Sequence, residues 1–341
     1  MHIVVYGAGS IGCYLGAALQ QEGLRVTLIG RPRIADEIRA NGGIRISDYL
    51  GSDQQVTDIR FETSVAALSD ADIVLVTLKC LAMEQASEAI LHYCRPGTRI
   101  ICLQNGLGSD QPLRRQPHDL NIQPGITGFN VVHCGTAHFH RATEGDLSLT
   151  DDDVLQPLQT ALQEQRITVK TVQDFDAVIW AKLQLNLNNA INALSGIPLK
   201  EQLLQRGYRR LLAQAMKEAA SVAAGKGIRP AQLTALPPRL LPYLINSPDF
   251  LFRRLAGKML AIDPQARSSM WEDLQQQRPT EIYFINGAIV AEAEKLGIAT
   301  PVNRALCRLI HEVETGRRQP GMSAEALQQA VYSSGHSLSK S

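Results

Sequence analysis

Short apolar runs alternate with amphipathic stretches through the first half of the chain. The runs are rich in β-branched residues, as strands are, and the stretches between them repeat their apolar residues at helical spacing. Strands are predicted at 2–6, 25–29, 73–78 and 99–103, and helices at about 10–22, 33–41 and 82–93. Strands that are almost continuously apolar and alternate with helices predict a parallel sheet covered on both faces.

From about residue 173 the pattern changes to long helical segments. They are predicted at 174–194, 200–226, 263–276, 279–296 and 301–315. Five prolines lie between residues 230 and 250, which predicts a loop-rich connection inside this helical half.

The chain ends in a polar, serine-rich segment, where we expect only a short helix at about 323–332. The whole pattern predicts an α/β protein in which an N-terminal Rossmann-type domain, a fold that commonly binds dinucleotides, precedes an all-helical C-terminal domain. The predicted parts are 1–172 for the nucleotide domain, 173–317 for the helical domain and 318–341 for a tail.

The bulk composition narrows the function. A length of 341 residues exceeds the usual single core, in agreement with two domains. The net charge of +1, without a basic run, argues against nucleic acid as the main partner. Six cysteines form no C-x-x-C pair, and no apolar run approaches the roughly 20 residues that span a bilayer. We therefore predict a cytoplasmic protein with no membrane partner.

A glycine motif follows the first predicted strand and opens the first predicted helix. Its G-x-G-x-x-G pattern comprises Gly7, Gly9, Ser10, Ile11 and Gly12, together with Ala8. Such glycines let the backbone approach a pyrophosphate, whose charge is stabilised at the helix N-terminus. A plain glycine turn is the alternative interpretation.

The end of the second predicted strand indicates which dinucleotide binds. An acidic residue there would bind the ribose 2′-hydroxyl of NAD and repel a 2′-phosphate. Arg31 and Arg33 stand there instead and can form charge-assisted contacts to phosphate. Unless they are merely solvated loop arginines, NADP(H) is the predicted cofactor. Lys79 and Asn105 follow two further strands at the same predicted sheet edge, although either could simply end its strand.

The segment 180–192 places a lysine, Lys182, and four asparagines among apolar residues. The asparagines are Asn186, Asn188, Asn189 and Asn192. Reducing a ketone with a hydride requires a proton donor or a cation at the oxygen, and neutral amides can orient the substrate. Lys182 fits the first requirement, but it could also be a structural lysine whose ammonium reaches solvent.

A second polar cluster spans residues 267–287 and contains Ser269 and Glu281. The chain between these two residues is long enough for two helices to bring them together. The alternative interpretation of Glu281 is a carboxylate in the first turn of a helix, where the helix dipole favours a negative charge.

Taken together, these stretches resemble the ketopantoate reductase (2-dehydropantoate 2-reductase) family from Met1 to about Glu314. The resemblance rests on five motifs: G-x-G-x-x-G, VTLK ending at Lys79, QNG at Asn105, WAKLQLN around Lys182, and SSMWEDLQQQRPTEI followed by ING. It implies NADPH-dependent reduction of a branched 2-keto acid to the 2-hydroxy acid. The expected substrate is 2-dehydropantoate, which becomes pantoate in pantothenate and coenzyme A biosynthesis.

The resemblance also implies residue roles. Lys182 would act as the general acid towards the keto oxygen, and Glu281 would orient the substrate and the lysine. Ser269 and Asn186 would contact the substrate, and Asn105 would lie near the nicotinamide and the substrate.

For the rest of the cofactor, the resemblance places Lys79 near the adenosine half and Arg31 at the 2′-phosphate. It requires no metal, and His138 and His140, with their neighbours, match no common zinc spacing.

The sequence departs from the family pattern in the catalytic helix. The family spaces its two helix asparagines four residues apart, but two extra residues lie between Asn186 and Asn192. A helix cannot absorb two residues without rotating one anchor by about 200°, unless a π-bulge or a break intervenes. We expect Asn186 and then Asn192 at the substrate, whereas a regular helix would favour Asn189, which shares a face with Lys182.

Other departures concern the substrate. Ala266 and Tyr283 replace polar residues of the family pattern, and the proline-rich segment is atypical. The alternatives are therefore a reductase of a different 2-keto acid and a catalytically silent NADP-binding regulator. A regulator would need neither Lys182 nor Glu281, so their presence argues against it. The long apolar helices permit a homodimer without requiring one.

Overall fold

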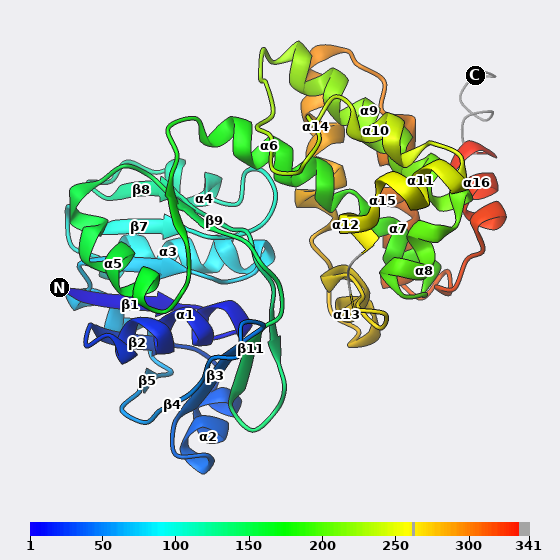
Figure 1. Cartoon of the computed structure of the whole chain (residues 1–341). Helices are drawn as coiled ribbons and strands as arrows, with labels where there is room; N and C mark the ends of the chain where they lie inside the picture. Colours follow the sequence, from blue (N-terminus) through cyan, green and yellow to red (C-terminus); the bar gives the residue numbers. More distant parts are fainter. Residues whose placement is uncertain (261–262, 334–341) are drawn as a thin grey trace. The chain divides into compact units, whose positions relative to one another are not determined.

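A computed structural model describes residues 1–260 and 263–333, and the end of the predicted tail lies outside the described residues. The chain divides into two compact units (Figure 1). Unit 1 comprises residues 1–105 and 109–175, and unit 2 comprises residues 106–108 and the chain from residue 176 onward. Among the described helices, none has the length and hydropathy needed to cross a bilayer.

Unit 1 contains a six-stranded sheet of order β5-β2-β1-β6-β7-β8 in which every neighbouring pair is parallel. Its strands are β1 (His2–Tyr6), β2 (Arg25–Ile29), β5 (Arg60–Glu62), β6 (Ile73–Val76), β7 (Arg99–Cys102) and β8 (Asn121–Pro124). The four strands predicted from the sequence are β1, β2, β6 and β7, which form the centre of the sheet. The predicted α/β class with a parallel sheet is confirmed.

Helices cover both faces of this sheet. They are α1 (Ser10–Gln21), α2 (Pro32–Ala40), α3 (Met83–Tyr93), α4 (Gln111–Arg114) and α5 (Gln156–Glu164). Successive side chains of a strand point to opposite faces. Accordingly, Ile3 and Val5 of β1 belong to one buried cluster with α1, whereas Val4 belongs to another with α3. This burial of both faces explains why the central strands are apolar at most positions.

Two smaller sheets complete unit 1, and the sequence did not predict them. One has the order β10-β11-β3-β4 and the other β13-β12-β9. Their strands are β3 (Ile44–Asp48), β4 (Asp53–Val56), β9 (Ile126–Thr127), β10 (Val131–His133), β11 (His138–Arg141), β12 (Leu147–Leu149) and β13 (Val169–Thr171). Most of these strands are short and mix polar with apolar residues, so their pattern is weak. Short 3₁₀ helices η1 (Val65–Asp70), η2 (Cys80–Ala82) and η3 (Asp153–Leu155) lie between the larger elements.

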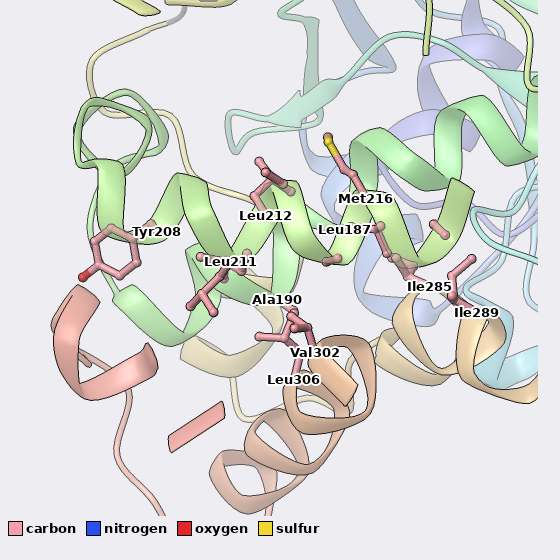
Figure 2. Close-up of a cluster of buried hydrophobic side chains, with 14 of the residues drawn as sticks. Leu187, Ala190, Tyr208, Leu211, Leu212, Met216, Ile285, Ile289, Val302 and Leu306 are labelled. Atoms are coloured by element: carbon pink, nitrogen blue, oxygen red, sulfur yellow. The ribbon is translucent and has the colours of Figure 1, made fainter. Parts of the chain in front are cut away.

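Unit 2 is helical in the residues that the structure describes. Its helices are α6 (Phe175–Asn186), α7 (Asn188–Ser195), α8 (Leu199–Leu204), α9 (Arg206–Gly225), α10 (Leu241–Ile245), α11 (Asp249–Leu255), α12 (Gly257–Leu260), α13 (Ser269–Gln275), α14 (Asn286–Leu296), α15 (Pro301–Glu314) and α16 (Ala324–Tyr332), with the 3₁₀ helix η4 (Ile282–Phe284) before α14. Figure 2 shows part of the core, where Leu187 and Ala190 lie among side chains of α9, α14 and α15.

Several predicted helices of unit 2 have different boundaries. The segment predicted at 263–276 becomes helical only at Ser269, because Ser268 caps the helix from an extended conformation. The segment predicted at 279–296 begins with η4, and α14 starts only at Asn286, because the backbone of Ile285 is not helical. The helices at 301–315 and 323–332 are confirmed as α15 and α16.

Candidate active site

The glycine motif forms the turn between β1 and α1. Gly7 has φ of +118°, and a Cβ there would lie 2.6 Å from the backbone nitrogen of Leu78. A Cβ at Gly12 would lie 2.2 Å from the carbonyl oxygen of Gly7. The packing of the turn itself therefore requires these two glycines.

Gly9 differs from the other two glycines of the motif. Within the described chain, a Cβ at Gly9 would meet no heavy atom within 4 Å, and Gly9 is exposed. Gly9 is also the N-cap of α1, where it offers no side-chain cap, and the first turn contains no acidic residue. A helix N-terminus with uncapped N–H groups beside open backbone suits an anion such as a pyrophosphate.

The loop after β2 contacts this turn. The N–H groups of Gly7 and Ala8 both donate to the carbonyl oxygen of Ile29, at 3.0 and 2.9 Å. A Cβ at Gly30 would lie 2.5 Å from the Cβ of Ala8, so glycine lets the two loops approach. Arg31, the next residue, is therefore held close to the glycine turn.

The two arginines of this loop have different surroundings. Arg31 is exposed, and its guanidinium makes no hydrogen bond or ion pair with any residue that the structure describes. Arg33 lies 3.5 Å from Glu37, and that carboxylate also pairs with His133 at 2.6 Å and accepts from the N–H of Ala137 at 2.7 Å. Arg31 is therefore the better candidate for a phosphate contact.

Glu37 is held ionised by its partners. Burial alone would raise the pKa of this carboxyl, but the hydrogen bonds from Ala137 and His133, with the charges of His133 and Arg33, lower the pKa below its ordinary value. The resulting negative charge is the partner of Arg33.

Two further loops meet the same edge of the sheet as the glycine turn, since β6 and β7 run parallel to β1. Lys79 is exposed and precedes η2, and Asn105 follows β7. The Cys80 thiol donates to the carbonyl oxygen of Asn105 at 2.9 Å. Gln104 donates to the carbonyl oxygen of Val76 at 3.1 Å. These bonds fix the loops that carry Lys79 and Asn105.

The residues after Asn105 belong to unit 2. The N–H of Leu107 donates to the carbonyl oxygen of Phe284 at 3.0 Å. Gly106 has φ of +87°, and a Cβ there would lie 2.2 Å from the same oxygen. Glycine is thus required both by the backbone conformation and by the close approach of η4.

The catalytic helix predicted at 174–194 is interrupted at Leu187, between α6 and α7. The interruption is mild, because Leu187 keeps helical dihedral angles and its N–H still donates to Leu183, at 3.1 Å. Lys182, Asn186 and Asn189 are partly exposed. At spacings of four and seven residues from Lys182, Asn186 and Asn189 lie on the same face of a nearly continuous helix.

The other two asparagines of the segment are buried. Asn188 exchanges two hydrogen bonds with Gln202, at 3.1 and 2.9 Å. Asn192 is 0% exposed, donates to the carbonyl oxygen of Ile197 at 2.9 Å and accepts from the N–H of Ser268 at 2.9 Å. The prediction that Asn192 is the second substrate contact therefore needs revision: both ends of its amide are bonded inside the protein, and Asn189 is the better candidate.

Two adjacent serines precede and begin α13, which packs against α7. Ser268 is buried, and its hydroxyl accepts from the N–H of Trp271 at 3.2 Å and donates to the carbonyl oxygen of Asn189 at 3.2 Å. Ser269 is exposed at the first position of the helix. The two serines therefore differ: Ser268 is hydrogen-bonded inside the protein, whereas Ser269 is exposed.

Glu281 lies in a short loop rather than in the first turn of a long helix. It directly precedes η4, and its side chain does not cap that helix. The buried Thr280 fixes this loop, since its N–H donates to Glu314 at 2.8 Å and its hydroxyl accepts from the N–H of Ile282 at 3.3 Å. The interpretation of Glu281 as a helix-start carboxylate does not match this backbone.

The histidines considered as metal ligands have another partner. The hydroxyl of Ser47 lies 2.7 Å from Nε2 of His138 and 2.7 Å from Nδ1 of His140. Among the described residues, no group of three or more His, Cys, Asp or Glu side chains is arranged to hold a metal ion.

Sequence reasoning did not single out Ser268 or Thr77, and it ranked Asn189 behind Asn186 and Asn192. Thr77 donates to the carbonyl oxygen of Gly7 at 2.7 Å and so supports the glycine turn. Its signal was a polar residue near the end of an apolar strand. For Ser268, the sequence contained one indication: a serine directly before a helical pattern is typical of a helix N-cap.

Comparisons with known proteins agree with these features. The sequence profile of the ketopantoate reductase PanE/ApbA family matches residues 3–153, and the profile of its C-terminal part matches residues 174–314. The 2-dehydropantoate 2-reductase of Archaeoglobus fulgidus is 26% identical over 321 residues, which cover 92% of this chain and 98% of the relative.

Solved structures show the same fold. A PanE/ApbA family ketopantoate reductase from Ralstonia eutropha superimposes with a TM-score of 0.80 at 26% identity, over 94% of this chain and 100% of the other. A D-mandelate dehydrogenase solved with NADH and anilino(oxo)acetate shares the fold at 22% identity, with a TM-score of 0.75 over 93% of this chain and 99% of the other. The chain belongs to the ketopantoate reductase family, a family of dinucleotide-dependent oxidoreductases.

Proposed function

We propose that the protein reduces 2-dehydropantoate to pantoate with NADPH, a step of pantothenate biosynthesis. The observation that carries the proposal is that Lys182, Asn186 and Asn189 share a partly exposed face of the α6–α7 segment. This face belongs to a chain of the ketopantoate reductase family, and the named relative from Archaeoglobus fulgidus is aligned over nearly its whole length.

The cofactor contacts follow from unit 1. The N–H groups at Gly9, Ser10 and Ile11 would hold the pyrophosphate of NADPH, which supplies the hydride when bound. Arg31 would contact the 2′-phosphate, since its guanidinium has no partner within the described chain whereas Arg33 is paired with Glu37. Lys79 would lie beside the adenosine half, and Asn105 beside the nicotinamide.

The keto acid contacts follow from unit 2. As the carbonyl carbon accepts a hydride, negative charge develops on its oxygen, and the Lys182 ammonium would donate a proton there. Asn186, Asn189 and the exposed Ser269 would bind the carboxylate and hydroxyl groups of the substrate. Glu281, an anion in a loop fixed by Thr280, would orient the lysine and the substrate.

Complementation of growth tests this proposal. The wild-type chain is expressed in a bacterium that lacks ketopantoate reductase and needs added pantothenate. Growth without pantothenate is expected from the wild type and from Lys217→Ala, a partly buried lysine on α9 that contacts Tyr243. Lys182→Ala should not restore growth. Failure of the soluble wild-type protein to restore growth would contradict the proposed substrate.

Two expectations from the sequence stay predictions: a homodimer and a cytoplasmic location. Light scattering on the purified chain measures the first, and fractionation of the native host measures the second.

A further inference from the structure

A buried polar connection joins the catalytic helix to the segment that precedes α13. Asn192 lies on α7 with 0% exposure, and its side-chain oxygen accepts from the N–H of Ser268 at 2.9 Å. Its side-chain nitrogen donates to the carbonyl oxygen of Ile197 at 2.9 Å, beyond the end of α7. One amide therefore holds two backbone segments at once, and each partner group is satisfied by it.

The segment 266–268 is attached to its surroundings at further points. The N–H of Leu199 donates to the carbonyl oxygen of Ala266 at 2.9 Å. The guanidinium of Arg267 donates to the carbonyl oxygen of Gly196 and lies 4.3 Å from the ring of Trp271. The hydroxyl of Ser268 donates to the carbonyl oxygen of Asn189 at 3.2 Å. The start of α13 is thus fixed against α7 by side-chain and backbone bonds rather than by apolar packing alone.

We infer that Asn192 is a positioning residue: through Ser268 it holds Ser269 in place relative to Asn189. The inference rests on the proposed function, in which Ser269 and Asn189 contact the keto acid. Asn192 itself is enclosed, so it acts on the substrate only through the backbone it holds. A misplacement of about 1 Å at a substrate contact lowers catalysis by up to about 100-fold.

The same geometry explains the two extra residues of the catalytic segment. Two of its four asparagines are partly exposed and two are buried, and the buried pair are bonded to different elements: Asn188 to Gln202 and Asn192 to Ser268. In this segment, Asn186 and Asn189 would contact the substrate, whereas Asn188 and Asn192 hold neighbouring elements in place.

The test compares Asn192→Ala with Asn188→Ala. Both variants remove a buried amide from α7, so both should lower the melting temperature. Only Asn192→Ala should raise KM for 2-dehydropantoate, by about 10-fold or more, and lower kcat, with the Kd of NADPH unchanged. An unchanged KM in a folded Asn192→Ala protein would overturn the inference.

A double-variant cycle separates positioning from direct contact. Asn192→Ala removes the acceptor of the Ser268 backbone N–H, and Ser268→Ala removes the hydroxyl that bonds Asn189 and Trp271. If both side chains hold the same segment, the two changes together should alter kcat/KM by less than the product of their separate effects. Independent, multiplicative effects would overturn the inference and favour direct contact of Asn192 with the substrate. Where Asn192→Ala fails to fold, Asn192→Leu replaces it, since leucine is close to asparagine in size and has no oxygen to accept from Ser268.

Hydrogen exchange provides a readout that does not depend on activity. Asn192→Ala should speed amide exchange at Ser268 and Trp271 by about 10-fold, whereas Asn188→Ala should leave these amides at the wild-type rate. Equal exchange in the two variants would overturn the inference even if the protein reduced another keto acid. A wild type that turns over no 2-keto acid would contradict the proposed function and leave this comparison intact.

Discussion

The turn between β1 and α1 and the α6–α7 segment both contain candidate site residues, but they are built in different ways. The turn is defined by its own backbone: Gly7 and Gly12 leave no room for a Cβ, and Gly9 is open. The α6–α7 segment is defined by side chains, some of which face outward while others bond distant backbone, as Asn192 does. A local motif therefore identifies the first site, whereas the second needs tertiary structure to assign each amide.

The largest expected effect is on the chemical step in unit 2. Lys182→Ala removes the proton donor, so kcat/KM for 2-dehydropantoate should fall by about 10²- to 10⁴-fold. The Kd of NADPH, measured by cofactor fluorescence, should stay at the wild-type value because the contacts of unit 1 are intact. Lys217→Ala serves as the control. A near wild-type rate for Lys182→Ala would show that another group protonates the substrate.

A smaller effect is expected at the cofactor phosphate. Arg31→Ala should weaken NADPH binding by roughly 10- to 100-fold, the loss of a charge-assisted hydrogen bond of about 1.5–3 kcal/mol, and leave NADH binding unchanged. Arg33→Ala is the matched control from the same loop, since Arg33 already pairs with Glu37. Titration of both variants with NADPH and with NADH measures the ratio of the two dissociation constants. Equal losses for NADPH and NADH would remove Arg31 from the 2′-phosphate.

The glycines of the turn sharpen the comparison within unit 1. Gly12→Ala places a Cβ against the Gly7 carbonyl and Thr77, so it should destabilise the protein by about 1–3 kcal/mol. Gly9→Ala meets no such atom in the described chain, so its unfolding midpoint should stay near the wild type while NADPH binding weakens by about 10-fold. Denaturant titration and cofactor titration distinguish the two. A destabilised Gly9→Ala with normal binding would contradict this division.

The smallest expected effect is on the pH dependence of stability, through Glu37, the partner of Arg33. The pKa of Glu37 is lowered in the folded protein from its ordinary value of 4.5, so the unfolded chain binds the proton more readily. The stability that Glu37 contributes is thus complete above about pH 4.5 and is lost as the pH falls through the folded pKa. Glu37→Gln should have a lower melting temperature than the wild type at pH 7. The difference between the two melting temperatures should be smaller at pH 3. A difference that is constant with pH would contradict the lowered pKa of Glu37.

The sequence predicted the central sheet and the nucleotide turn well because both have strong local signals. Four apolar strands and one glycine motif appear where the pattern placed them. The small sheets were missed because β3 and β11 pair across about 90 residues and mix polar with apolar positions.

The candidate site in unit 2 could be predicted only in part. Lys182 and Asn186 were proposed from the residues and their family pattern, and both are partly exposed. The choice between Asn189 and Asn192 depended on the mild interruption at Leu187 and on the partner of each amide, neither of which the order of residues contains. Glu281 showed a helix-start pattern, but the bonds of Thr280 set a loop there instead.

The most direct test of the account is the oxidation of NADPH by the purified chain with a panel of 2-keto acids, followed by chromatography of the product. We predict that 2-dehydropantoate has the highest kcat/KM of the panel and that pantoate forms in an amount equal to the NADPH consumed. Tight NADPH binding without turnover of any 2-keto acid would contradict the account, and a higher kcat/KM for another acid would contradict the assigned substrate.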